Sequence, residues 1–133
     1  MTTTATARAA EINAETRARA AAEGWAGFGT LVEDPAYWAS AGIVTGDDLD
    51  RYLAHCDYVD TFKDAHGIKP RWTSWRDATA AEWAARTADL VEAEARAAAE
   101  EARREAVAAA KVAAATTPTP LTHNPFAALR GRE

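Results

Sequence analysis

The sequence predicts an all-α protein with a small helical core, a long alanine-rich C-terminal helix and a flexible tail. Apolar residues recur with helical spacing over residues 46–66, and no proline or glycine interrupts residues 71–117. Large apolar residues gather between Trp25 and Val91, whereas alanine supplies more than half of the 48% hydrophobic content. The core is therefore expected to be smaller than a chain of 133 residues would allow.

The pattern divides the chain into four parts. These are an alanine-rich N-terminal helical arm (1–24), a helical core (25–95), the protruding end of the long helix (96–115), and a linker with a C-terminal docking motif (116–133). Ile12 is the only large apolar residue of the arm's helix, so the arm is expected to be frayed or weakly docked before Gly24 ends it. Trp25 and Phe28 stand among three glycines and are expected to anchor a loop to the core.

Capping residues predict where the core helices begin and end. Asp34 and Pro35 start a short helix, and Thr45 caps a longer amphipathic helix over residues 46–66. Gly67 is expected just past the end of that helix, in the left-handed conformation. The apolar face of the longer helix comprises Leu49, Tyr52, Leu53, Cys56 and Val59. Another side carries an acidic ridge made of Asp50, Asp57, Asp60 and Asp64.

A capping box, Thr79 to Glu82, starts the long helix, and Trp83, Leu90 and Val91 form an apolar stripe in its first part. Beyond Ala98 the stripe gives way to alanine with interspersed acidic and basic residues, which support a helix through i,i+4 pairs. This half needs no partner to be helical. Its small side chains would also permit close pairing, so a homo-oligomer through the long helix is one predicted assembly.

Composition excludes several classes of protein. A net charge of −5 argues against binding nucleic acid with the whole surface. The single cysteine, Cys56, permits neither an intramolecular disulfide nor a cysteine-based metal site, which suits a reducing cytoplasm. No apolar run approaches the roughly 20 residues of a membrane span, and the N-terminus lacks the pattern of a secretory signal. The protein is expected to stay in the compartment where it is made.

The sequence predicts no catalytic residues, no cofactor and no metal site. His55 and Cys56 are adjacent on a helix, so their side chains point about 100° apart and cannot form a nucleophile–base pair. The acidic ridge is interpreted mainly as a solvated face, with a partner-facing strip and a hard-cation site as alternatives. The protein is therefore expected not to be an enzyme.

The segment that follows the amphipathic helix combines cations with tryptophans. Its candidate partner-binding residues are Lys63, Lys69, Arg71, Trp72, Trp75 and Arg76. Cations that alternate with stacking rings are typical of single-stranded nucleic acid binding. In the alternative interpretation, which we favour, both tryptophans close the core and the cations pair with the acidic ridge. Two further candidate residues, Phe126 and Leu129, share one face of a short helix in the tail, as in a docking peptide.

Residues 62–71 read Phe-Lys-Asp-x-x-Gly-x-Lys-Pro-Arg. This string resembles a signature found in small, functionally uncharacterised proteins of tailed bacteriophages and prophages, an aromatic-Lys-acid-x-x-Gly-x-Arg/Lys-Pro-Arg motif. The resemblance covers about residues 52–72, and Lys69 stands where arginine is commoner in that family. It implies a phage or mobile-element origin in a bacterial host and implies no particular activity.

Together these observations predict a non-enzymatic, phage-encoded interaction protein that binds a host or phage protein, either in host takeover or in virion assembly. The long helix, with Phe126 and Leu129, is expected to carry that contact. The alternative is a small nucleic-acid-binding protein that uses the segment from Lys63 to Arg76. The predicted location is the bacterial host cytoplasm, with the virion as the alternative, and no membrane partner is expected.

Overall fold

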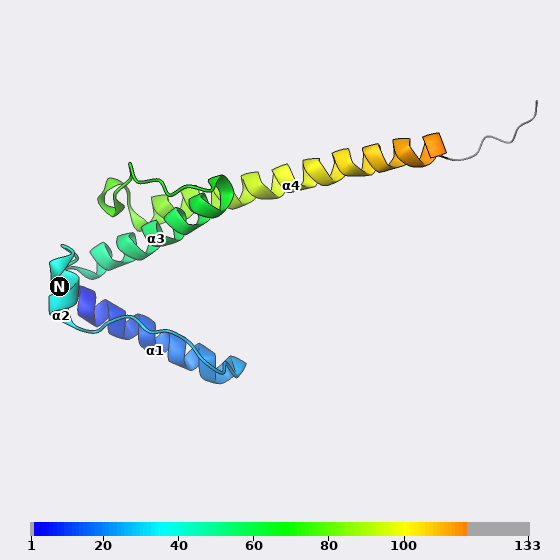
Figure 1. Ribbon diagram of the computed structural model, residues 1–133. Coiled ribbons are helices and arrows are strands. Elements are labelled where there is room, and N and C mark those ends of the chain that lie inside the picture. The colour runs from blue at the N-terminus through cyan, green and yellow to red at the C-terminus, as the bar shows by residue number, and fades with distance from the viewer. Residues whose placement is uncertain (1, 117–133) are drawn as a thin grey trace, which may run out of the picture. The chain divides into compact units, whose positions relative to one another are not determined.

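The computed structural model describes residues 2–116, and within this range the protein is all-α, as predicted. Its elements are α1 (Ala5–Glu23), α2 (Pro35–Ser40), α3 (Gly46–His66), the 3-10 turn η1 (Trp75–Asp77) and α4 (Ala80–Thr116), drawn in Figure 1. The chain forms two compact units, one that runs to Glu94 and one that starts at Ala95. Each unit is described by itself below.

The first unit begins with a short pairing between the segments that lead into α1 and α3. Thr4 and Thr45 form an isolated antiparallel β-bridge. The amide of Ala5 donates to the carbonyl of Val44 (2.9 Å), and the amide of Gly46 donates to the carbonyl that precedes Thr4 (2.7 Å). The first amides of a helix have no partner within the helix, so each helix start here supplies an acceptor for the other. We call this pairing the N-terminal bridge.

The two threonines of the N-terminal bridge also cap their own helices. The Thr4 hydroxyl accepts from the amide of Ala7 (3.1 Å), and the Thr45 hydroxyl accepts from the amide of Asp48 (3.0 Å). The Asp48 carboxylate accepts from the Thr45 amide in return (3.1 Å), which completes a capping box. The predicted cap at Thr45 is therefore confirmed.

The buried core of the first unit lies next to the N-terminal bridge. Its members are Ala5, Ala9, Trp38, Ile43 and Leu49. Two of these five come from α1, so the prediction of a weakly docked arm outside a core of residues 25–95 is wrong. The helices approach closely because the residues between them are small; a Cβ built on Gly46 would lie 3.2 Å from the Cβ of Arg8. The alanines contribute to this core because their small side chains let α1 and α3 pack closely, and not because they bury a large apolar surface.

A charged contact joins α1 to α3 about one turn beyond the N-terminal bridge. The Arg8 guanidinium donates to Asp50 (3.0 Å) and also to Glu11 (3.1 Å). Both hydrogen bonds raise the pKa of Arg8 above its ordinary value, and the bond to Asp50 has the larger effect. Among residues 2–116, Asp50 is thus the member of the acidic ridge that pairs with a cation, and that cation comes from α1.

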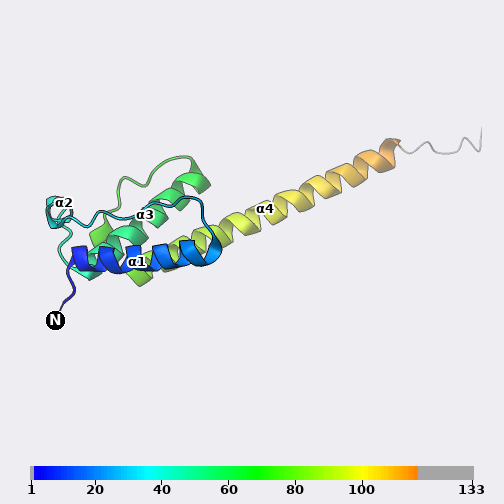
Figure 2. The same cartoon turned by 90° about the horizontal axis from the view of Figure 1, so that it is seen from below.

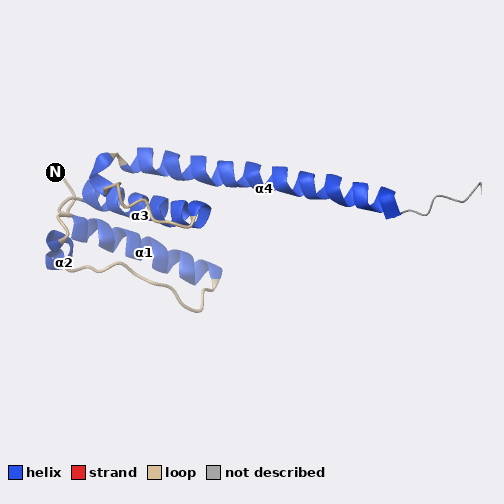
Figure 3. Cartoon of the chain, turned by 45° about the horizontal axis from the view of Figure 1, so that its top comes forward, coloured by secondary structure: helices blue, strands red, loops and turns tan. Residues whose placement is uncertain are grey.

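The segment between α1 and α2 runs back along α1, as Figure 3 shows. Asn13, which is 1% exposed, fixes it by donating to the Leu31 carbonyl (2.8 Å) and accepting from the Leu31 amide (2.7 Å). The Trp38 indole then donates to the carbonyl of Val32 (2.7 Å). The rings expected to anchor this segment are instead exposed, with Trp25 at 42% and Phe28 at 44%. A buried amide replaces the predicted aromatic anchors.

The loop after α3 turns back beside that helix before α4 begins (Figure 2). Thr79 caps α4 as predicted, since its hydroxyl accepts from the amide of Glu82 (3.1 Å). Trp83 is fully buried and its ring lies 4.6 Å from that of His55 and 5.0 Å from that of Tyr58. Trp83 is therefore the residue that attaches the start of α4 to α3.

The described part of the second unit, residues 95–116, is the later part of α4. Every residue in it is exposed, and Glu100 pairs with Arg104 at 3.5 Å, in the i,i+4 geometry expected from the sequence. Between residues 2 and 116, none of the helices is long and apolar enough to cross a membrane.

Replacement of Asn13 by Ala tests the amide pairing. The change favours the helix intrinsically by a few tenths of a kcal/mol, but it leaves the Leu31 amide and carbonyl without their partner. We expect a loss of about 1–3 kcal/mol in the free energy of unfolding, measured by urea denaturation. The exposed Glu15→Ala on the same helix is the control and should change stability by less than about 0.5 kcal/mol. Equal effects of the two substitutions would contradict this role of Asn13.

Candidate partner-binding surface

The site begins where α3 ends. Gly67 adopts the predicted left-handed conformation (φ 77°), and its amide donates to the Lys63 carbonyl (2.7 Å), which closes the helix. The chain then passes through a buried Pro70, and the amide of Arg71 donates to the Lys69 carbonyl (2.9 Å).

Three of the candidate cations gather around one open hollow of about 500 Å³ at this corner. Its lining residues are Lys63, Gly67, Ile68, Lys69 and Arg71, all of them exposed. A Cβ built on Gly67 would meet no atom within 4 Å, so the hollow is open at that position. Ile68 belongs to no pattern that pointed to a site in the sequence; it is 59% exposed and adds an apolar wall.

Within residues 2–116 these cations have no carboxylate partner. The expected pairing of Lys63, Lys69 and Arg71 with the acidic ridge is absent there, because no ion pair of that kind is formed and Asp50 contacts Arg8. Lys63 still has a local role, since a cation in the last turn favours the negative end of the α3 dipole. The positive charge of the hollow is therefore available to an external anion.

Trp72 lies beside these cations and is 67% exposed. Its ring meets Phe62 edge to face, with the ring centroids 5.5 Å apart, and Phe62 in turn contacts His66 at 4.4 Å. The prediction that Trp72 closes the core is therefore wrong. The ring rests on one aromatic neighbour and presents most of its surface to solvent. We call Lys63, Ile68, Lys69, Arg71 and Trp72 together the corner surface.

Trp75 and Arg76 belong to a different place. Trp75 is half-buried and packs against the core, as predicted for a core-closing ring, and its carbonyl accepts from the Trp83 indole (3.1 Å). The Arg76 guanidinium stacks over the Trp75 ring, 4.3 Å from its centroid, and occupies the space where a Cβ on Gly42 would lie. The six residues proposed from sequence thus separate into a corner group and a core group.

The remaining two candidates, Phe126 and Leu129, lie outside the described residues.

His55 holds the returning loop in place. Its Nε2 lies 2.9 Å from the Thr73 hydroxyl, which itself donates to the Pro70 carbonyl (2.8 Å). A hydroxyl has one proton, so His55 must donate through Nε2 and Thr73 must accept. Burial lowers the pKa of His55, and the nearby charge of Asp77 opposes that shift. His55 is therefore a positioning residue for the corner surface, a role the sequence analysis missed because Thr73 is 18 positions away.

Cys56 does not combine with His55. Burial raises the pKa of the Cys56 thiol, and its hydrogen bond with Tyr52 only partly offsets this. A thiol of raised pKa is a poor nucleophile at neutral pH. Between residues 2 and 116, no three or more His, Cys, Asp or Glu side chains are grouped so that they could hold a metal ion.

No protein-family model matches this chain, and no curated protein or solved structure is significantly similar to it. Interpretation of the corner surface therefore depends on its own geometry.

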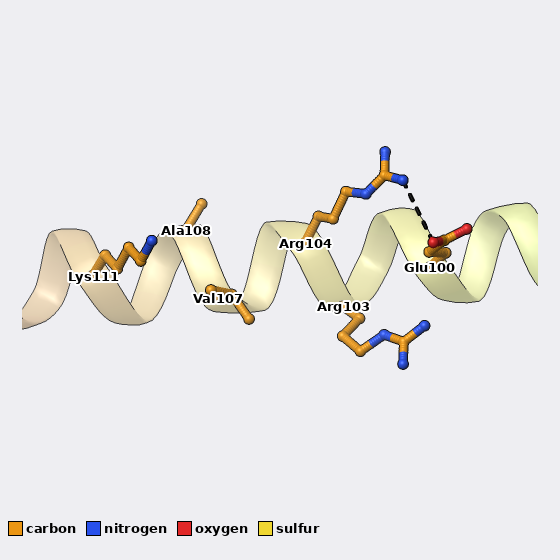
Figure 4. A pocket seen from close by; sticks show the side chains of 6 residues that line it. All are labelled: Glu100, Arg103, Arg104, Val107, Ala108 and Lys111. Atoms are coloured by element: carbon orange, nitrogen blue, oxygen red, sulfur yellow. Dashed lines mark ion pairs between the residues drawn. The ribbon is translucent and has the colours of Figure 1, made fainter.

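Two other hollows in the described part of the chain have a smaller net positive charge than the corner hollow. A smaller apolar one of about 260 Å³ lies between the start of α1 and α2, with Trp38 and Ile43 among its lining residues. A shallow one follows the second unit's helix, where Figure 4 shows Arg104 directed towards Glu100 and Arg103 on another side. Its acid–base pair neutralises one of its cations. The corner hollow is distinct in having three cations and no paired acid among the described residues.

The lowered pKa of His55 predicts a pH dependence of stability. As the pH falls below about 6.5, the unfolded chain takes up a proton at this position before the folded chain does. Stability contributed by His55 is thus complete above that pH and declines between it and the lower folded pKa. Urea unfolding at pH 7.5, 6.5 and 5.5 should show the wild type losing more stability than His55→Gln, since the other histidines are common to both. A gap between the two proteins that is constant with pH would refute the assignment.

Proposed function

We propose that this chain is a non-enzymatic interaction protein that binds an acidic region of a partner protein through the corner surface. One observation carries the proposal: Lys63, Lys69 and Arg71 surround a single hollow without carboxylate partners among residues 2–116. Unneutralised charge of one sign attracts its complement and orients it. The apolar surfaces of Ile68 and Trp72 beside it supply the contact area that charge alone does not.

The favoured partner is a protein because the surroundings of the corner are acidic. Asp57, Asp60 and Asp64 lie exposed along the same helix as Lys63, and the chain carries a net charge of −5. A nucleic acid backbone extending beyond the hollow would meet this repulsion, whereas a protein can offer acidic groups at the hollow and other side chains elsewhere. The phage or prophage origin is part of this proposal and is supported by the resemblance of residues 62–71.

Single-stranded nucleic acid is the second candidate, favoured by one specific observation. The Trp72 ring is 67% exposed and adjoins Arg71, so a base could stack on it while a phosphate meets the cation. Replacement of Trp72 by Ala tests this second candidate. Loss of a stacking ring should weaken binding of a short DNA strand by about tenfold or more, because one stacked base contributes about 1–3 kcal/mol.

Other partners remain predictions. Self-association through the long helix and docking by Phe126 and Leu129 are each expected from the sequence alone. Location in a bacterial host cytoplasm or virion is likewise a prediction.

A labelled glutamate-rich peptide tests the proposed function at low salt. Removal of one charge-assisted contact by Arg71→Ala should weaken its binding by about tenfold, as measured by fluorescence anisotropy. The matched control is Arg19→Ala, which removes the same charge from an exposed position of α1 that has no ion pair among the described residues. Equal losses in the two variants, or no binding at all, would contradict the proposal, and stronger binding to single-stranded DNA that depends on Trp72 would favour the second candidate.

A further inference from the structure

From the chemistry of its hollow, we infer that the corner surface is a binding site for one phosphate monoester group. This group belongs to a phosphorylated side chain of the partner protein. This inference rests on the proposed function and narrows it from acidic regions in general to a phosphorylated one.

Charge is the first reason. Lys63, Lys69 and Arg71 bring three positive charges to one hollow, and no acid of the described chain is paired with them. A carboxylate carries a single negative charge, whereas a phosphate monoester carries between about −1.5 and −2 at neutral pH. The dianion therefore matches the three cations more closely than an aspartate or glutamate does.

The donors of the hollow are the second reason. Arg71 can offer two parallel N–H groups to one oxyanion, and each lysine ammonium offers three donors. Ile68 and Lys69, which also line the hollow, have backbone amides without an acceptor within residues 2–116, so these two N–H groups remain available to a ligand. Phosphate has three oxygens that accept strong hydrogen bonds, so it can use donors from several directions at once.

Space is the third reason. The hollow of about 500 Å³ is open at Gly67, where no side chain stands. Ile68 lines the hollow and Trp72 directly follows the lining residue Arg71 in the chain; both side chains are exposed and can contact the apolar part of the residue that bears the phosphate. One anionic group matches this arrangement, whereas a continuous polyanion would also experience the repulsion of exposed acids such as Asp60 and Asp64 on α3.

The test compares two small aromatic anions on the full-length protein by ¹⁵N NMR titration. Phenyl phosphate is the dianion and benzoate is the monoanion, so the two probes share a ring and differ mainly in charge and oxygen number. We expect phenyl phosphate to shift the amide signals of Ile68, Lys69 and Arg71 saturably, with a dissociation constant about tenfold lower than that of benzoate, which corresponds to about 1.4 kcal/mol.

Two variants complete the test. Arg71→Ala should weaken phenyl phosphate binding by about tenfold, whereas Arg19→Ala should leave it unchanged; unshifted amide signals elsewhere would show that both variants are folded. Equal affinities for phenyl phosphate and benzoate, or shifts spread evenly over all cationic positions, would overturn the inference.

The phenyl phosphate titration and the experiment with the glutamate-rich peptide can fail independently of one another. If the peptide binds through Arg71 while phenyl phosphate binds no better than benzoate, the inference of a phosphate-binding site is wrong, and the proposed binding of an acidic partner is retained. If neither the peptide nor phenyl phosphate affects the corner surface, both are wrong.

Discussion

The arrangement of the first unit depends on the N-terminal bridge. Two helix starts, each with unpaired amides, satisfy one another through the bonds at Ala5 and Gly46, so neither helix can be placed without the other. The bridge brings Arg8 opposite Asp50 and packs the alanines of α1 against Leu49. With its first turn fixed in this way, α3 becomes the element on which the corner is built.

This geometry determines which charged side chains of the first unit are paired and which are not. Asp50, one of the four acids of the acidic ridge on α3, pairs with a cation from α1, and Arg76 stacks on the Trp75 ring. The cations of the corner are left without acidic partners among the described residues, at the opposite end of α3 from the bridge. His55 and Trp83 then tie the returning loop and the start of α4 to α3, which keeps Arg71 and Trp72 beside the last turn of α3. A binding surface on ordered elements needs less ordering when it meets a ligand.

Local rules predicted much of this molecule from its sequence. Thr45, Gly67 and Thr79 mark helix ends because capping depends on residues only a few positions apart. What could not be predicted depends on distant pairs. Ala9 is buried only because another element packs closely against it, and an alanine side chain does not indicate which element that is. Asn13 has its hydrogen-bond partner, Leu31, 18 positions away. Hydrophobicity likewise could not tell the exposed ring of Trp72 from the buried ring of Trp83.

The N-terminal helix is part of the core because α1 and α3 are held together at their starts. Amide hydrogen exchange of the full-length protein, followed by NMR, tests it most directly. We expect the amides of Ala5 and Gly46 to exchange about as slowly as that of the buried Leu49, since all three should open only when the unit unfolds. Exchange of Ala5 and Gly46 at the rate of an unstructured chain, while Leu49 stays protected, would contradict it.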